Sequence, residues 1–314
     1  MRISGITFAV RKTHRTRNVI LTIVVILLLA ILAVVVVSAY QGWNILHPPK
    51  KDTDAFSSNI VPEYRDISFK GTDKDLLLNG WFFQSGSSDK TVIMAHSYGG
   101  NRLEFGMQTL DIIKDFLTKG YNVFTFDFRY SGRSGGKFSS FGYAEKDDLL
   151  AAIDYVRQQG SKHVVLMGFS TGASACILAA EENKTVEAVI ADSAYSDLDE
   201  FFRNNLNHLT KLPSFPFNST VLISMEVISG IEIKEASPIR SINDLAPCRI
   251  LLIHGKGDPL IPEENSRDLY SAYSQNNAGK AQLWETDADG IADSYLKDPA
   301  GYMGKVFEFL EAGE

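Results

Sequence analysis

Three short segments of the chain carry residue types that can form a nucleophilic site, and the first contains a serine between glycines. The pentapeptide GFSTG, residues 168–172, follows the apolar run HVVLMGF and precedes the helix-forming stretch ASACILAAEE. A strained strand-to-helix turn needs small residues on both sides of Ser170, and it raises the hydroxyl group above the sheet, near the first N–H groups of the helix. We therefore expect Ser170 to be a nucleophile. The structural alternative is a glycine-rich turn with an incidental serine.

The second segment is SYGG, residues 97–100, which follows the apolar run KTVIMAH. A loop with two glycines beside a nucleophile can aim a backbone N–H group at a developing oxyanion. We expect the N–H groups of Tyr98 and Thr171 to form this oxyanion hole. His96 precedes the loop and has the pKa range of a base, but we expect it to brace the loop by hydrogen bonding.

The third segment is KGDPLIP, which follows the apolar run RILLIHG. Asp258 lies just past the end of that run, in a turn closed by Pro259. A carboxylate in this position can orient an imidazole, and a serine followed by an aspartate is the chain order of one hydrolase triad. On its own, an aspartate in a turn would carry no functional meaning.

Short apolar runs of strand length alternate with amphipathic stretches along most of the chain. The expected strands are YRDISFK, LLLNGWFF, KTVIMAH, YNVFTFDF, HVVLMGF, VEAVIAD, RILLIHG and AQLWET; the expected helices are 103–118, 144–158, 171–182, 263–274 and 299–310. This alternation predicts an α/β protein with a mostly parallel sheet flanked by helices. In such sheets the chemistry gathers beyond the carboxyl ends of the strands, where all three segments lie.

Residues 19–39 form an uncharged apolar run of 21 residues. At about 1.5 Å per residue the run spans roughly 30 Å of hydrocarbon, so we expect one transmembrane helix. A cleaved signal peptide is the alternative, since VSA at 37–39 resembles a cleavage site, but signal peptides have shorter apolar regions of about 7–15 residues. Basic residues precede the run at positions 2, 11, 12, 15 and 17, against Lys50 and Lys51 after it. This asymmetry predicts a single-pass protein of the cell membrane with a cytoplasmic N-terminus and the rest of the chain outside the cytoplasm.

The expected organisation is a basic cytoplasmic tail (1–18), the transmembrane anchor (19–39), a stalk (40–60) and one large α/β domain (61–314). A segment rich in phenylalanine, about 197–236, interrupts the strand–helix alternation and reads as an inserted small helical cap. Its aromatic side chains could line a pocket for an apolar acyl or aromatic group, or they could simply pack the cap against the sheet.

The amino-acid composition of the chain argues against some classes of binding partner. Without the five basic residues before the apolar run, 26 Lys and Arg residues face 38 Asp and Glu residues, a net charge of about −12. A domain so acidic is unsuited to binding nucleic acid or anionic lipid by electrostatics. Cys176 and Cys248 each lie in an apolar run, where a buried free thiol is the default, so we expect no disulfide framework.

Seven segments together resemble the α/β-hydrolase superfamily, and most closely its membrane-anchored BEM46-like branch near the serine aminopeptidase-type hydrolases. They are HSYGG, FDFRYSGRSGG, GFSTG, ADSAYSDL, SPIRSI, LLIHGKGDPLIP and SYLKDPAGYMGKVFEFL, and they run from about residue 63 to the C-terminus. The resemblance implies an α/β-hydrolase fold without a cofactor, with Ser170 as nucleophile and Asp258 as triad acid. It also implies Tyr98 and Thr171 as oxyanion donors. Asp127 and Arg129 would support the loop that flanks the site.

The chain departs from the family at one position. After the last strand the family carries a loop in which glycine precedes the catalytic histidine, whereas here Gly290 precedes Ile291 and no histidine follows His254. Loss of one triad member lowers turnover by about 10⁴–10⁶-fold. His96, His254 and His208 are the available substitutes. We expect the first two to have structural roles and His208 to lie in the cap.

Two functions remain open on these grounds. The first is a membrane-anchored serine hydrolase-like protein for small ester or amide substrates, impaired because the triad histidine is missing. The second is a non-catalytic α/β-hydrolase-fold binding or scaffold protein. The loop before Ile291 also resembles the start of a calcium loop, ETDADG, but Leu296 stands where such a loop needs an acidic residue, so we expect no metal site.

Overall fold

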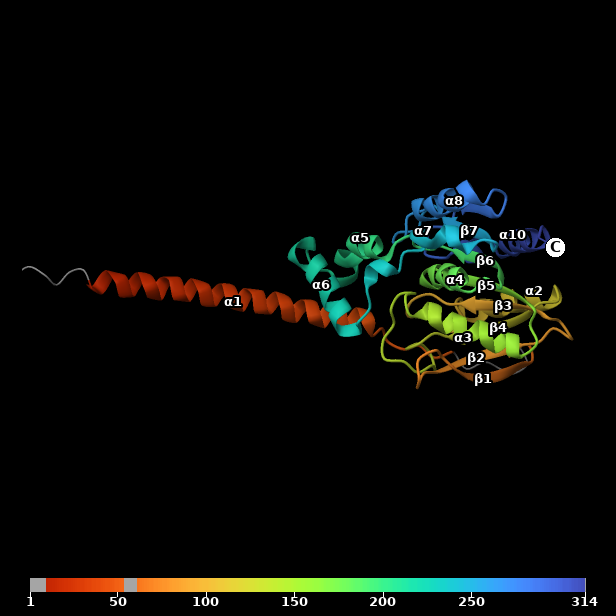
Figure 1. Ribbon diagram of the computed structural model, residues 1–314, viewed down its shortest axis with the longest axis horizontal. Helices are drawn as coiled ribbons and strands as arrows, with labels where there is room; N and C mark the ends of the chain where they lie inside the picture. Colours follow the sequence, from red (N-terminus) through yellow and green to blue (C-terminus); the bar gives the residue numbers. More distant parts are fainter. Residues whose placement is uncertain (1–9, 54–60, 314) are drawn as a thin grey trace, which may run out of the picture.

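The computed structural model describes residues 10–53 and 61–313. Within these residues, eight strands form one sheet in the order β1-β2-β4-β3-β5-β6-β7-β8 (Figure 1). The strands are β1 (Tyr64–Lys70), β2 (Leu77–Phe83), β3 (Lys90–Ala95), β4 (Asn122–Asp127), β5 (His163–Phe169), β6 (Val186–Asp192), β7 (Arg249–Gly255) and β8 (Ala281–Thr286). The pairs β1–β2 and β2–β4 are antiparallel and the remaining neighbours are parallel, which confirms the predicted mostly parallel sheet.

Helices cover both faces of the sheet because successive strand residues point to opposite sides. Ile93 of β3 packs in one core with α3 (Glu145–Gln158), α4 (Thr171–Glu182) and α8 (Glu264–Asn276). Its neighbour Val92 packs in a second core with α2 (Thr109–Thr118) and α10 (Pro299–Glu311). Shorter helices complete the connections: η1 (Gly106–Gln108), η2 (Ile233–Glu235), α7 (Pro238–Ser241), η3 (Ile242–Leu245) and α9 (Ser294–Lys297).

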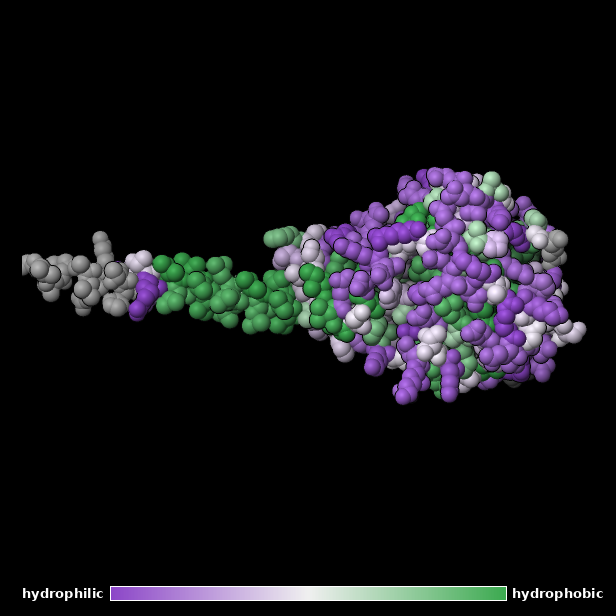
Figure 2. All heavy atoms as spheres, in the orientation of Figure 1, coloured by the Kyte–Doolittle hydropathy of each residue, from purple (hydrophilic) through white to green (hydrophobic). Residues whose placement is uncertain are grey.

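Helix α1 (Val10–Leu46) projects away from this domain as one long rod (Figure 1). Between Arg15 and Leu46 it is long and apolar enough to cross a membrane, with a mean hydropathy of 3.6 in its most apolar stretch and none of that stretch buried. Figure 2 shows the hydrophobic surface of this rod between a hydrophilic end and the domain. The length and composition meet the requirements of an anchor and of a signal sequence alike. Residues 1–9 of the expected cytoplasmic tail lie outside the described residues.

The segment expected to be a stalk, 40–60, differs in part from that expectation. Helix α1 continues to Leu46, and Ile45 and Leu46 are buried in a third apolar cluster with residues such as Phe141 and Tyr195. The backbone N–H group of Ser139 donates to the carbonyl of Leu46 at 2.9 Å. Burying the side chains of an isoleucine and a leucine in an apolar cluster lowers the free energy relative to leaving them in a solvated linker. Residues 54–60 of the stalk lie outside the part of the chain that the structure describes.

Residues 197–236 form the helices α5 (Leu198–Thr210) and α6 (Ser214–Ser229), followed by η2. Both helices lie beside the inner end of α1 rather than over the middle of the sheet (Figure 1). Phe202 is fully buried in the third cluster and Phe201 and Phe217 pack partly against it, whereas Phe215 is 90% exposed. Most of the aromatic side chains in this segment therefore pack within the third cluster, where the rings of Phe201 and Phe202 contact Phe141.

Candidate active site

Ser170 occupies a strained turn between β5 and α4. Its backbone has φ 52° and ψ −119°, a conformation that a residue with a side chain rarely adopts, and its N–H group donates to the carbonyl of Asp192 at 2.8 Å. The flanking glycines are required by contact. A Cβ atom at Gly168 would lie 2.4 Å from the carbonyl oxygen of Gly172, and one at Gly172 would lie 2.5 Å from the carbonyl oxygens of Ala95 and His96. Ser170 thus has the geometry that the pentapeptide predicted.

The backbone N–H groups of Tyr98 and Thr171 have no acceptor among the described residues. Thr171 begins α4, where the first N–H groups of a helix have no intrahelical partner. Tyr98 follows the end of β3, which lies beside β5 in the sheet and so next to the turn that carries Ser170. Two free N–H groups at neighbouring strand ends are suited to hold an anionic oxygen.

The loop that carries Tyr98 is fixed from several sides. His96 Nε2 accepts from the N–H group of Phe128 at 3.0 Å, so its Nδ1 carries the proton and donates to the carbonyl of Ser97 at 2.7 Å. The N–H group of Ser97 in turn donates to Glu104 Oε2 at 2.7 Å. Burial raises the pKa of Glu104. Both nitrogen atoms of His96 are engaged, as expected for a bracing histidine.

Asp258 follows β7 and is nearly inaccessible to solvent. Its Oδ1 accepts from the N–H groups of Leu260 and Ile261, each at 2.9 Å. Its Oδ2 is buried and has no hydrogen-bond partner in the described part of the chain. Burial raises the pKa of Asp258, and the two backbone donors and the nearby Ser193 hydroxyl offset part of that rise. The side chain therefore presents one carboxylate oxygen with an unmet requirement for a donor.

The loop that carries Ile291 contacts Ser193, which is close to Asp258. The N–H group of Ala292 donates to Ser193 Oγ at 3.1 Å, and Ser193 follows Asp192, whose carbonyl holds the N–H group of Ser170. Ala292 is buried and has a φ of 54°, whereas Ile291 is half-buried. Ser193 thus connects three parts of the candidate site: the end of β6, which bonds Ser170, the carboxyl group of Asp258, and the loop that carries Ile291. The position of the expected imidazole holds an alkyl side chain that can neither accept nor donate a proton.

The other two histidines expected as substitute bases, His254 and His208, lie in different surroundings. His254 is fully buried; its Nε2 donates to the carbonyl of Ile261 at 2.7 Å and its Nδ1 accepts from the hydroxyl of Ser266 at 2.6 Å. Burial lowers the pKa of His254, which favours the neutral ring. Its Nε2 lies 3.9 Å from Asp258 Oδ2, too far for a hydrogen bond. His208 is exposed on α5.

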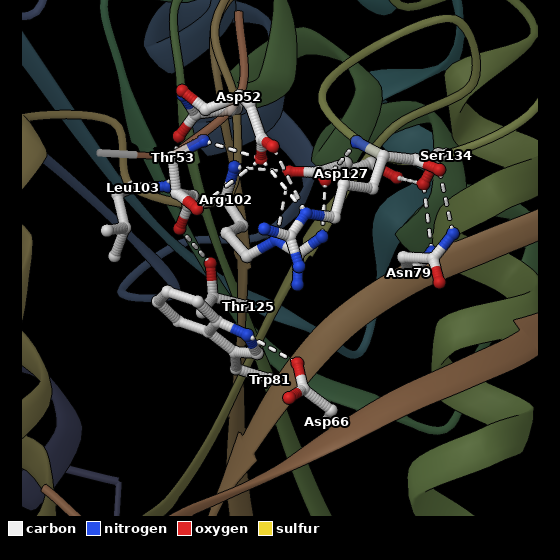
Figure 3. Close-up of polar contacts among 12 residues, drawn as sticks. Asp52, Thr53, Asp66, Asn79, Trp81, Arg102, Leu103, Thr125, Asp127 and Ser134 are labelled. Carbon is white, nitrogen blue, oxygen red and sulfur yellow. Dashed lines mark hydrogen bonds and ion pairs between the residues drawn. The ribbon is translucent and has the colours of Figure 1, made fainter. Parts of the chain in front are cut away.

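Asp127 and Arg129 hold the loop after β4, as the resemblance implied. Figure 3 shows Asp127 beside Arg102 and Ser134; Asp127 Oδ1 accepts from the N–H group of Arg102 at 2.8 Å, and the two side chains form a buried ion pair of 2.5 Å. Arg129 forms a second buried ion pair, 2.7 Å long, with Asp148. Asp52, from the segment after α1, also reaches this loop and pairs with Arg133 at 3.1 Å on the surface.

Three features near the site were not foreseen from the sequence. Ser193 connects the loop of Ile291 to the end of β6, Glu104 holds the N–H group of Ser97, and the carbonyl of Ile45 accepts a 2.6 Å hydrogen bond from the Tyr98 hydroxyl. The signal for Ser193 was available, because it directly follows a predicted strand between two strands that carry site residues. Within the described residues, no group of three or more acidic, histidine or cysteine side chains is arranged to hold a metal ion.

Comparisons with known proteins identify a family model and several relatives that are similar to this chain. A family model described as X-Pro dipeptidyl-peptidase (S15 family) matches residues 87–230. The chain is 29% identical over 239 residues to the uncharacterized protein YqkD of Bacillus subtilis, covering 74% of this chain and 75% of that protein. It is 26% identical over 234 residues to the lysophosphatidylserine lipase ABHD12 of Gallus gallus, covering 73% of this chain and 58% of that protein.

Among solved structures, the esterase PF2001 of Pyrococcus furiosus aligns with a TM-score of 0.70 at 30% identity, covering 85% of this chain and 98% of that chain. The acylaminoacyl peptidase of Pyrococcus horikoshii aligns with a TM-score of 0.60 at 18% identity, covering 79% of this chain and 41% of that chain. The first likeness extends over nearly all of the relative, whereas the second shows a shared fold.

Proposed function

The chain belongs to the α/β-hydrolase superfamily, and we propose that it is a membrane-anchored serine-hydrolase-like protein for small ester or amide substrates whose triad lacks its base. Ser170 is the nucleophile in this proposal, Asp258 is the triad acid, and Tyr98 and Thr171 supply the oxyanion donors. The names of an esterase and a lipase among the relatives favour ester substrates, while the S15 family model supports amides.

One observation carries the proposal: Asp258 Oδ2 is buried without a hydrogen-bond partner at the point where a triad acid would hold an imidazole. Buried carboxylate oxygens are normally satisfied, and an unsatisfied one asks for an explanation. The nearby loop carries Ile291 and is bonded through Ala292 to Ser193, whose hydroxyl adjoins the same carboxyl group. A carboxylate that lost its imidazole partner accounts for this arrangement.

The chemistry that remains is stabilisation without proton transfer. In a complete triad the imidazole takes the serine proton as the hydroxyl attacks and returns it to the leaving group. Within the described residues no imidazole is hydrogen-bonded to Ser170, while the free N–H groups of Tyr98 and Thr171 can still stabilise a developing oxyanion. Such a site retains about 10³–10⁴-fold acceleration over water at most and lacks the larger triad contribution.

The second candidate is a non-catalytic binding or scaffold protein, and the half-buried Ile291 favours it. An isoleucine near the nucleophile increases the apolar surface available to a bound acyl group and cannot take part in turnover. The two candidates share one binding site and differ in whether a covalent acyl intermediate forms on Ser170.

A fluorophosphonate probe distinguishes the two candidates. The full chain in detergent micelles should be labelled slowly, and the label should disappear in Ser170→Ala. Ser196→Ala, a change at a serine after β6 whose hydroxyl bonds to Asn265, is the matched control and should leave the label unchanged. Fast labelling of the unmodified chain would show that another base acts on Ser170 and would contradict the impaired site. No label even after prolonged exposure supports the binding protein.

The anchoring part of the proposal rests on α1 and on the basic residues before its apolar stretch. We propose that α1 spans the cell membrane once, with the N-terminus in the cytoplasm and the sheet domain outside it. Protease added to intact cells should then remove the domain. Recovery of a soluble, N-terminally trimmed chain would identify a cleaved signal peptide instead, and complete protection of the domain would reverse the orientation.

A further inference from the structure

Helix α6 presents an apolar ridge that no part of the described chain covers. Phe215 is 90% exposed, Ile223 is 57% exposed and Val227 is 78% exposed. Ser219, Ile223 and Val227 are spaced four apart, so they lie along one side of the helix, and Phe215 precedes them where the backbone is not helical (φ −101°, ψ 131°). The sequence of α6 contains a single charged residue, Glu226. A surface helix of a soluble domain normally places charged side chains on its exposed side.

The side of α6 next to this row of exposed residues packs against α1. Ser38 Oγ lies 2.7 Å from Thr220 Oγ1, and the hydroxyl of Ser224 donates to the carbonyl of Ser38 at 2.8 Å. A Cβ atom at Gly42 would lie 2.5 Å from Ser224 Oγ, so the two helices approach closely where α1 has no side chain. Small and hydroxyl residues of this kind favour close helix contacts in membranes.

The order of these contacts shows which end of α6 lies nearest the apolar part of α1. Ser38 meets Thr220 and Ser224, and Gly42, one turn further along α1, meets Ser224 and Met225. The two helices therefore run in the same direction, and the beginning of α6, with Phe215, points back toward the exposed apolar stretch of α1. Figure 2 shows hydrophobic surface continuing from α1 onto the adjacent end of the domain.

We propose that the ridge of Phe215, Ile223 and Val227 inserts into the bilayer leaflet on the domain's side of the membrane, beside the anchor. The inference rests on the proposed membrane anchoring. A lipid leaflet is the occupant that fits, because α1 holds this ridge next to the apolar stretch that the membrane itself would cover. The chain then contacts the membrane twice, through the spanning helix α1 and through the exposed apolar side chains of α6 that enter the leaflet beside it.

Site-directed fluorescence tests the insertion in the full chain. Phe215→Cys and Val227→Cys are labelled with an environment-sensitive nitrobenzoxadiazole dye and reconstituted in phosphatidylcholine vesicles that contain nitroxide-labelled lipid. Leu28→Cys, in the middle of the apolar stretch of α1, reports on anchoring. Glu308→Cys on α10, at the end of the domain farthest from α1 in Figure 1, is the solvent control. Cys176 and Cys248 are buried, and burial raises the pKa of both thiols, so the native cysteines stay unlabelled.

The expected result is a blue-shifted emission and strong nitroxide quenching at positions 28, 215 and 227, with neither effect at position 308. Quenching at position 28 but not at 215 or 227 would overturn the inserted ridge and leave the anchor intact. Absence of quenching at position 28 would overturn the anchor and the ridge together. A blue shift at position 215 without nitroxide quenching would mean that protein, such as a second copy of the chain, covers the ridge, and it would also overturn the proposal.

Discussion

The hydroxyl of Tyr98 donates a 2.6 Å hydrogen bond to the backbone carbonyl of Ile45, which joins the last turn of α1 to the loop beside the nucleophile. The Tyr98 ring stacks on Phe141 with a centroid separation of 3.9 Å, and Phe141 belongs to the same apolar cluster as Ile45. The proposed membrane helix is thus bonded directly to a residue expected to supply an oxyanion donor. Any tilt of α1 relative to the domain must move or break this contact.

Tyr98→Phe removes the hydrogen bond and keeps the ring stack. The carbonyl of Ile45 is then left without its donor in a nearly dry place, so we expect the free energy of unfolding to fall by about 1–2 kcal/mol. Hydrogen exchange at residues 43–48 should accelerate, since the end of α1 loses an attachment to the domain. Thermal unfolding and hydrogen–deuterium exchange of the full chain in detergent micelles measure the two effects.

Tyr130→Phe is the matched control for that change. Tyr130 also adjoins the segment after α1, with His47 at the edge of its ring and Lys50 over its face, but its hydroxyl has no hydrogen-bond partner among the described residues. We expect this variant to match the unmodified chain in stability and exchange. Equal effects of the two substitutions would show that the Tyr98–Ile45 bond does not hold α1.

Asp258→Asn should stabilise the chain at neutral pH. Because burial raises the pKa of Asp258, the folded state binds a proton more readily than the unfolded state, whose carboxyl keeps its ordinary value of 3.8. The contribution of this carboxyl to stability is therefore greatest below about pH 4 and declines as the pH rises through the folded-state pKa. Asparagine does not titrate and can keep the bonds from Leu260 and Ile261 on its oxygen.

The measurable quantity is the difference in the free energy of unfolding between Asp258→Asn and the unmodified chain. We expect it to grow from about pH 4 to pH 7, because the carboxyl group of the unmodified chain loses its stabilising contribution over that range while asparagine does not titrate. Asp192 is buried as well, and burial raises its pKa to about 7; the charge of Asp258 adds to that rise, so the substitution also lowers the pKa of Asp192, and this change contributes to the difference with the same sign. A difference that does not change with pH would contradict a raised pKa of Asp258 in the folded chain.

Gly172→Ala tests the backbone contact beneath the nucleophile. The added methyl group would lie 2.5 Å from two carbonyl oxygens at the end of β3, and neither can move without shifting the oxyanion loop. We expect a loss of about 1–3 kcal/mol in stability, typical of overpacking. Gly304→Ala in α10 is the control, because nothing lies within 4 Å of its Cβ position and alanine favours helix by up to about 1 kcal/mol. Equal losses in both variants would contradict this account.

The sequence predicted those parts of the fold that depend on local chemistry. The apolar runs predicted the strands, because a strand of a parallel sheet that is buried on both faces consists of nearly continuous apolar residues. The expected helix 171–182 coincides with α4, since the glycines around Ser170 mark the turn before it. The brace at His96 was also predictable, because the residue at a strand end beside a glycine loop finds backbone groups to bond.

The contacts of α1 could not be predicted in the same way. Ile45 and Leu46 stand in a stretch with prolines and lysines nearby, so composition favoured a linker, and their burial depends on Phe141 and on residues of α5 and α6 far along the chain. Likewise, the apolar residues of α6 predicted a packed cap, yet only a three-dimensional arrangement shows which side meets α1 and which side is left bare. The roles of Ser170 and Asp258 remain predictions that the geometry supports.

The position of Ile291 gives the decisive test of the site. Ile291 directly precedes Ala292. The N–H group of Ala292 donates a hydrogen bond to the hydroxyl of Ser193, which adjoins the carboxyl group of Asp258. In Ile291→His, we expect an imidazole at this position to donate to the unpaired Asp258 Oδ2 and to accept from the hydroxyl of Ser170. Replacing a half-buried isoleucine should cost about 1–2 kcal/mol in stability.

A restored triad should raise turnover of a short-chain nitrophenyl ester by up to about 10⁴-fold, because proton transfer becomes available beside the proposed oxyanion donors. The gain must depend on the carboxylate. With Asp258→Asn added, the imidazole loses the group that selects its tautomer and stabilises its charge, so most of the gain should vanish.

Ile291→Gln, which is polar but cannot act as a base near neutral pH, is the matched control and should give no gain. Steady-state hydrolysis by the three variants and the unmodified chain, each checked for folding by circular dichroism, separates the outcomes. A folded Ile291→His protein without added activity would mean that the loop no longer points toward Ser170, and the non-catalytic binding protein would then be the better account.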